Sequence, residues 1–147
     1  MTKEETTAIL SILKAAYPNA YKGLTRKEAN GIISVWQMQF ADISMNIILM
    51  AVNKYISTNP YAPAVSDIKN KLKDLYYEAQ EMLIEHNNAL NNGIGTVLDN
   101  KSIYLINKII EETECVRYNN NEMTLFEMLT NNNNYLNPGE KEEKYDV

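Results

Sequence analysis

Apolar residues that recur at intervals of three and four are the feature that most constrains the fold of this chain. Five stretches have this period, which places their apolar side chains along one face of a helix. No strand-rich block and no repeat interrupts them, so the chain is predicted to be all-α. The five faces are Ala8, Ile9, Ile12, Leu13 and Ala16; Ala29, Ile32, Ile33, Trp36 and Phe40; Ile47, Ile48, Ala51, Val52, Tyr55 and Ile56; Ile68, Leu72, Leu75, Ala79, Met82 and Leu83; and Ile103, Ile106, Ile109, Ile110, Thr113 and Val116.

Helix starts and stops bound these stretches. Thr2 with Glu5, and Thr25 with Glu28, have the Thr-x-x-Glu spacing of a capping box, in which each side chain satisfies a free backbone donor. The third helix is expected to begin at Asp42 or Ser44 and the fourth at Ser66 or Val65. Prolines end the first and third helices, because they force the residue before them out of helical geometry. These prolines are Pro18, Pro60 and Pro63.

The helices suggest a division of the chain into three parts. Residues 1–85 are predicted to form a compact N-terminal bundle of about four helices. Residues 86–130 are a helical extension, with one helix over 99–117 and a short one near 122–130. Residues 131–147 form an acidic, Asn-rich tail that is predicted to be flexible, because it has too little apolar surface to bury. Apolar residues make up 45% of the chain, which is enough for a core in the helical parts.

Charge divides the chain differently. Residues 1–75 contain nine Lys or Arg and six Asp or Glu, a balance of +3, whereas residues 76–147 contain five and thirteen, a balance of −8. An acidic half repels a phosphate backbone and suits a basic protein surface. It is equally explained as a solvated surface that keeps the chain soluble. A basic rim of Lys22, Arg26, Lys27, Lys69, Lys71 and Lys73 leaves DNA binding as a minority hypothesis, so direct nucleic-acid binding is not expected.

The sequence favours binding over catalysis. It has no Gly-x-Ser-x-Gly, no His-Glu-x-x-His and no Gly-x-x-x-x-Gly-Lys phosphate loop, so nothing indicates a catalytic, cofactor or metal site. One cysteine, Cys115, excludes an internal disulfide and a cysteine-based zinc cluster. His86 lacks a ligand partner at helical spacing and is interpreted as a solvated residue near a helix end. The polar N-terminus and short apolar runs indicate a cytosolic protein with no membrane segment.

Three groups of residues are candidates for binding a partner protein. The first is an acidic ridge on the fifth helix, which is more simply explained as a solvated helix face. The second lies on the short 122–130 helix, which could dock in a groove of a partner or fold back onto its own core. The third lies in the tail. Trp36 is interpreted as core, because aromatic residues at helical spacing usually pack inside. The candidates are Glu111, Glu112, Glu114, Phe126, Met128, Leu129, Tyr135, Glu142 and Glu143.

The first 75 residues resemble the replicative-helicase loader and inhibitor family of phages of Gram-positive bacteria. The likeness rests on the order and spacing of several short segments over about half the chain. These segments are Met1–Thr6, Ile9–Leu13, Tyr17–Asn19, Val35–Met38, Ala51–Asn59, and Pro63 leading to Ser66–Lys69. The second half departs from the family, because residues 76–119 are predicted to be helical and fairly apolar. No helicase-binding residue can therefore be carried over.

The resemblance implies a phage replication protein in the cytoplasm of the infected host. Such a protein binds the hexameric, DnaB-type replicative helicase, holds it inactive and delivers it to an origin-bound initiator protein. It also implies a folded helical N-terminal domain, and no catalytic residues. The charge imbalance supports an alternative, in which the chain inhibits a host or defence DNA-binding protein by mimicking DNA.

Overall fold

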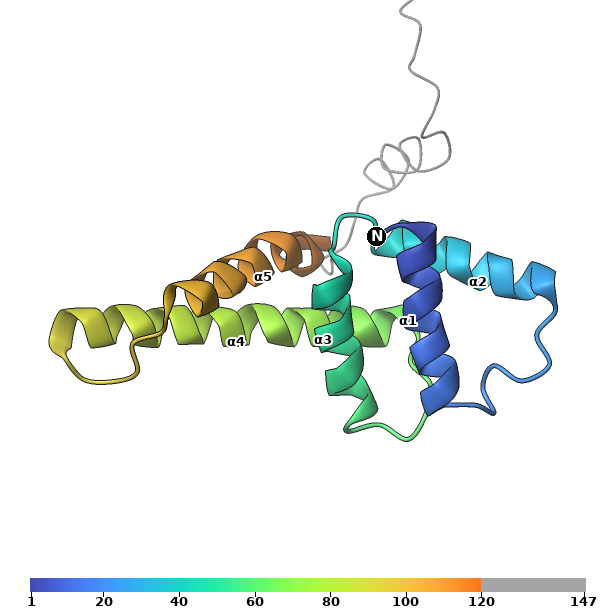
Figure 1. Cartoon of the computed structure of the whole chain (residues 1–147), viewed down its shortest axis with the longest axis horizontal. Helices are drawn as coiled ribbons and strands as arrows, with labels where there is room; N and C mark the ends of the chain where they lie inside the picture. Colours follow the sequence, from blue (N-terminus) through green and yellow to red (C-terminus); the bar gives the residue numbers. More distant parts are fainter. Residues whose placement is uncertain (120–147) are drawn as a thin grey trace, which may run out of the picture.

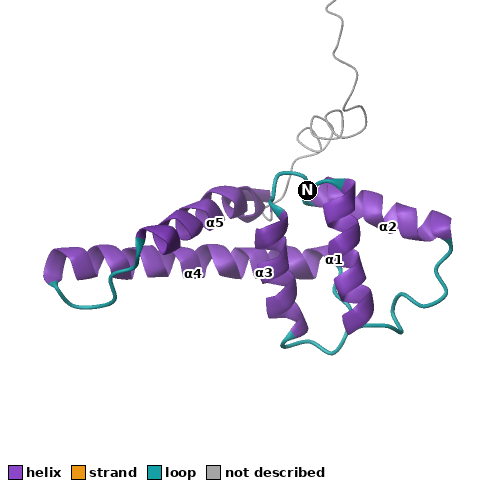
Figure 2. Cartoon of the chain, in the orientation of Figure 1, coloured by secondary structure: helices purple, strands orange, loops and turns teal. Residues whose placement is uncertain are grey.

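The structure, a computed structural model, describes residues 1–119, with side chains as far as Val116. This part consists of helices joined by loops and contains no strand, which confirms the predicted all-α class (Figure 2). None of its helices is long and apolar enough to cross a membrane. The predicted 122–130 helix and the tail lie outside the described residues. The helices are α1 (Lys3–Ala16), α2 (Arg26–Gln39), α3 (Met45–Ile56), α4 (Val65–Asn92) and α5 (Asn100–Asn119).

Both predicted capping boxes are present. The Thr2 hydroxyl accepts a hydrogen bond from the Glu5 amide at 3.1 Å, and the Glu5 carboxylate accepts one from the Thr2 amide at 2.8 Å. Thr25 and Glu28 repeat this exchange at the start of α2, at 3.2 and 2.8 Å. Each box satisfies amides that have no partner inside the helix. The predicted starts of α1 and α2 are therefore confirmed.

The next two helices begin at one of the two positions predicted for each. Ser44 is the N-cap of α3, but its side chain does not bond to the first turn of that helix. α4 begins at Val65, and the amide of Ala64 before it donates to the Asp67 carboxylate at 2.8 Å. α3 therefore needs an acceptor from elsewhere in the chain.

A single apolar core joins the helices. α1 packs against α2 and α3, α3 packs against α4, and α5 packs along α4. The N-terminal ammonium donates to the carbonyl of Ala41 at 2.9 Å, and the Tyr17 hydroxyl donates to the carbonyl of Asn59 at 2.7 Å. Burial raises the pKa of Tyr17, so its hydroxyl remains a donor at neutral pH. The buried core residues with the lowest exposure are Ile9, Leu13, Phe40, Ile48, Ala51, Val52, Ile68 and Leu72.

α4 and α5 form a long helical hairpin. α4 has 28 residues and is therefore about 42 Å long, and Figure 1 shows that it runs well past the N-terminal helices. Gly93 ends it at a φ of +69°, a conformation in which only glycine avoids a steric penalty. α5 then packs back along α4. The predicted domain boundary at residue 85 lies inside α4, and residues 86–92 continue that helix.

The predicted apolar faces are buried to different degrees. The face of α3 is buried except for Ile56, which is half-buried. On α2 only Trp36 and Phe40 are buried, with ring centroids 5.5 Å apart, so the core assignment of Trp36 is confirmed. Four members of the other faces sit at the margin of their helix's apolar side and are exposed, contrary to prediction. They are Ala8, Ile12, Ala16 and Met82.

Candidate protein-docking surfaces

The outer face of α5 carries the acidic residues that the sequence singled out. Glu111 and Glu114 are exposed on this helix, and no ion pair involves them among the described residues. A hollow of about 230 Å³ lies on the same face, beside Tyr104, Asn107 and Lys108. Tyr104 is 69% exposed. An acidic surface with a projecting aromatic ring suits a basic protein partner, because aromatic rings are common anchors in interfaces.

Sequence analysis missed Tyr104 as a member of this face. It lies four residues before Lys108 and seven before Glu111, and both spacings put side chains on the same side of a helix. The spacing could have revealed it. The search for acidic residues alone passed over it, and its exposure was not evident from the sequence.

Glu112, the third acidic candidate, makes a contact within the chain. Its carboxylate accepts hydrogen bonds from the Ser44 amide at 2.9 Å and from the Ser44 hydroxyl at 2.7 Å. Ser44 is the N-cap of α3, so the carboxylate occupies the place where a local cap would sit. A negative charge there also interacts favourably with the positive end of the helix dipole. Glu112 therefore ties α5 to the start of α3, 68 residues away in sequence.

His86 also makes a contact that the sequence did not predict. It is half-buried, and its Nδ1 accepts a hydrogen bond from the Leu98 amide at 3.0 Å. The interpretation of His86 as a solvated residue is therefore wrong, because the loop after α4 returns across its side chain. An accepting Nδ1 places the proton of the neutral ring on Nε2. Within residues 1–119, no cluster of three His, Cys, Asp or Glu could hold a metal ion.

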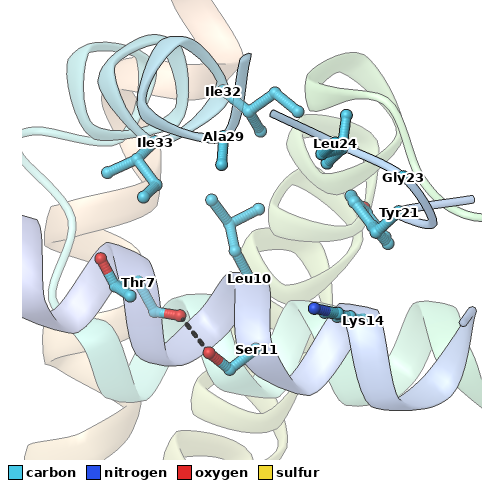
Figure 3. A pocket seen from close by; sticks show the side chains of 10 residues that line it. All are labelled: Thr7, Leu10, Ser11, Lys14, Tyr21, Gly23, Leu24, Ala29, Ile32 and Ile33. Atoms are coloured by element: carbon cyan, nitrogen blue, oxygen red, sulfur yellow. Dashed lines mark hydrogen bonds between the residues drawn. The ribbon is translucent and has the colours of Figure 1, made fainter. Parts of the chain in front are cut away.

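A second candidate surface is a groove between α1 and α2, shown in Figure 3. It has a volume of about 240 Å³, and its floor is made of half-buried apolar side chains. Leu10 projects from α1 toward Ala29 and Ile32 of α2. The predicted apolar face of α2 is therefore only partly used in the core. The lining residues are Thr7, Leu10, Ser11, Lys14, Tyr21, Gly23, Leu24, Ala29, Ile32 and Ile33.

The polar groups of this groove differ in what they offer a ligand. The Thr7 hydroxyl donates to the carbonyl of Lys3, and the Ser11 hydroxyl donates to the carbonyl of Thr7, each at 2.8 Å. Burial raises the pKa of Tyr21, so this side chain is neutral at physiological pH. Lys14 is the charged residue of the lining. The groove is therefore apolar, with a positive charge at its edge.

Comparison with known proteins identifies the part of the chain that contains this groove. Residues 1–69, just under half of the 147 residues, match the family model for the N-terminal domain of a phage helicase loader and inhibitor. This segment belongs to that family. The suspected family is thus confirmed for the N-terminal half, and residues 1–69 are called the loader domain below. No curated protein and no solved structure matched the chain.

The limits of the loader domain separate the two candidate surfaces. The match contains α1, α2, α3 and the first turn of α4, so the groove lies within it. The outer face of α5 lies outside it, and Glu112 joins the two parts through Ser44. The remaining candidates, Phe126, Met128, Leu129, Tyr135, Glu142 and Glu143, lie outside the described residues.

The basic residues of the N-terminal half do not form a continuous rim. Lys69 donates to the side-chain oxygen of Gln39 at 2.6 Å, and burial lowers its pKa. Lys71 pairs with Asp74 at 3.5 Å. Two of the six predicted cations therefore serve contacts within the chain. Three others are exposed near the groove instead: Lys22, Arg26 and Lys27.

Proposed function

We propose that this chain is a phage DNA-replication accessory protein that binds the hexameric replicative helicase, holds it inactive and delivers it to an origin-bound initiator. The observation that carries this proposal is the loader domain at residues 1–69. The chemistry of the sequence agrees with it, since no catalytic motif competes with a binding role. Such a protein works in the cytoplasm of the infected bacterium.

The outer face of α5 is our candidate for the helicase contact. Tyr104 and Glu111 lie on the same side of the helix, beside a hollow, and both are exposed. α5 is held to the loader domain by Glu112, so this face has a fixed position relative to the domain. A surface on a rigid element loses little conformational freedom when it binds.

Co-elution tests the proposal. The full chain is mixed with the purified hexameric helicase of the phage or its host, with ATP, and run on a sizing column. We expect the chain to elute with the hexamer. Elution at its own volume, with both helicases, would overturn the proposal.

A variant pair separates the helicase contact from the proposed role. The change Tyr104→Ala with Glu111→Lys should reduce co-elution, because it removes the ring and reverses a charge. The control is Asn53→Lys, which adds a positive charge at an exposed position of α3 and should co-elute normally. If both variants co-elute like the unchanged chain, the chain binds helicase by another surface.

The excess of acidic residues supports a second candidate function. Residues 76–147 have a balance of −8, and this charge could mimic DNA toward a host or defence protein that binds DNA. A pull-down from host lysate distinguishes the two functions. Capture of a nuclease or other DNA-binding protein, with no helicase, favours mimicry. Capture of the helicase favours the first proposal.

A further inference from the structure

The groove between α1 and α2 has positive charges at its edge that are not neutralised within the described residues. Lys14 lines the groove. Lys3 precedes Thr7 by four residues, and Arg26 precedes Ala29 by three, so both cations lie on the helix faces that form the groove. The ion pairs of residues 1–116 involve Lys54 and Lys71 instead. An apolar groove with a basic edge fits an apolar surface with an acidic edge.

The outer face of α4 has that composition. Tyr77 and Ile84 are 43% and 59% exposed, and their spacing of seven residues puts one above the other on the same side of the helix. Glu81 and Glu85 flank them and are exposed. No ion pair in the described part involves either carboxylate, whereas Glu78 pairs with Lys54. This face is an acidic, amphipathic helix surface of the kind that docks in apolar grooves.

A chain cannot bring its own two surfaces together. Figure 1 shows α2 at one end of the molecule and the α4–α5 hairpin extending to the other. α4 is a continuous helix of 28 residues, and α5 packs along it, so the hairpin cannot fold back onto the groove. A contact between the two surfaces has to join different copies.

We propose that the α1–α2 groove of one copy binds the outer face of α4 of a second copy. Tyr77 and Ile84 enter the apolar groove, and Glu81 and Glu85 face Lys14 and its neighbouring cations. The contact is heterologous, because the two copies use different surfaces. Such contacts propagate head to tail, and they close into rings when the rotation allows it.

The groove is small, so the contact is weak and depends on concentration and salt. Interfaces below about 1,200 Å² are typical of transient complexes. Neighbouring copies on a sixfold helicase would be brought close enough for it to form, a consequence that rests on the proposed function. The contact itself requires no helicase and is tested without one.

Sedimentation velocity of the full chain over a range of concentrations tests the proposal. The weight-average sedimentation coefficient should rise with concentration at low salt and rise less at high salt. Lys14→Glu and Glu85→Lys should each lower the association constant, roughly five- to tenfold. Lys101→Glu, at an exposed position of α5, and Asn53→Lys are the controls and should associate like the unchanged chain. Circular dichroism checks that every variant is folded.

Mixing the two variants gives the sharpest result. Lys14→Glu keeps an intact α4 face, and Glu85→Lys keeps an intact groove, so an equal mixture should recover association through one contact per pair. Recovery in the mixture supports the head-to-tail contact. A sedimentation coefficient that does not change with concentration overturns the proposal. So does association that both variants retain, or that their mixture fails to recover.

Discussion

Glu112 joins two parts of the chain that are far apart in sequence. Its carboxylate accepts two hydrogen bonds from Ser44, and Ser44 has no acceptor of its own for the start of α3. We predict that Glu112→Ala lowers the free energy of unfolding by about 1–3 kcal/mol, because it leaves a half-buried amide and the helix start without an acceptor. Urea denaturation measures this loss.

A matched change tests whether the loss belongs to this contact. Glu111→Ala removes the neighbouring carboxylate, which is exposed, and should change stability by less than about 0.5 kcal/mol. Glu112→Gln keeps an acceptor and should cost less than Glu112→Ala. Equal losses for Glu111→Ala and Glu112→Ala would show that the contact with Ser44 contributes nothing.

Glu28 makes the stability of the chain depend on pH. Hydrogen bonds from the backbone and side chain of Thr25 hold the pKa of this carboxyl below its ordinary value. A carboxyl with a lowered pKa in the folded state stabilises the fold above its unfolded pKa, and this stabilisation is lost as pH falls through the folded value. We therefore expect Glu28→Gln to make the loss of stability below about pH 5 shallower. Unfolding curves at several pH values measure it, and an unchanged slope contradicts it.

Among the elements, the α4–α5 hairpin depends on a contact near its closed end. The Leu98 amide donates to Nδ1 of His86, which holds the loop after Gly93 against α4. We predict that His86→Ala speeds hydrogen exchange at the Leu98 amide, because that amide loses its acceptor, and costs about 1 kcal/mol of stability. Exchange measured by NMR tests it. Asn88→Ala, at an exposed position of α4, is the control and should leave the exchange of Leu98 unchanged.

Sequence reasoning predicted the elements well where the signal was local. The capping boxes at Thr2 and Thr25 lie within four residues of chain, and their geometry is fixed by that spacing. The apolar faces located the helices because burial requires a period of 3.6. The end of α4 was less certain, since a run of Asn residues can continue a helix until Gly93 stops it.

At the scale of the whole molecule, the candidate site was only partly predictable. The acidic residues of α5 were found because charge is visible in the sequence. That Glu112 turns toward Ser44 while Glu111 faces solvent depends on how α5 packs, which no local pattern encodes. The groove was not foreseen for the same reason: the face of α2 predicted as core is covered by α1 only in part.

The most direct test of the central claim is the equilibrium affinity of the full chain for the hexameric replicative helicase in the presence of ATP. Biolayer interferometry with the immobilised chain measures it. We predict saturable binding that Tyr104→Ala with Glu111→Lys weakens by roughly tenfold or more, as expected when an interface anchor is lost. Asn53→Lys should bind like the unchanged chain. Absence of saturable binding to both the phage and the host helicase would contradict the account.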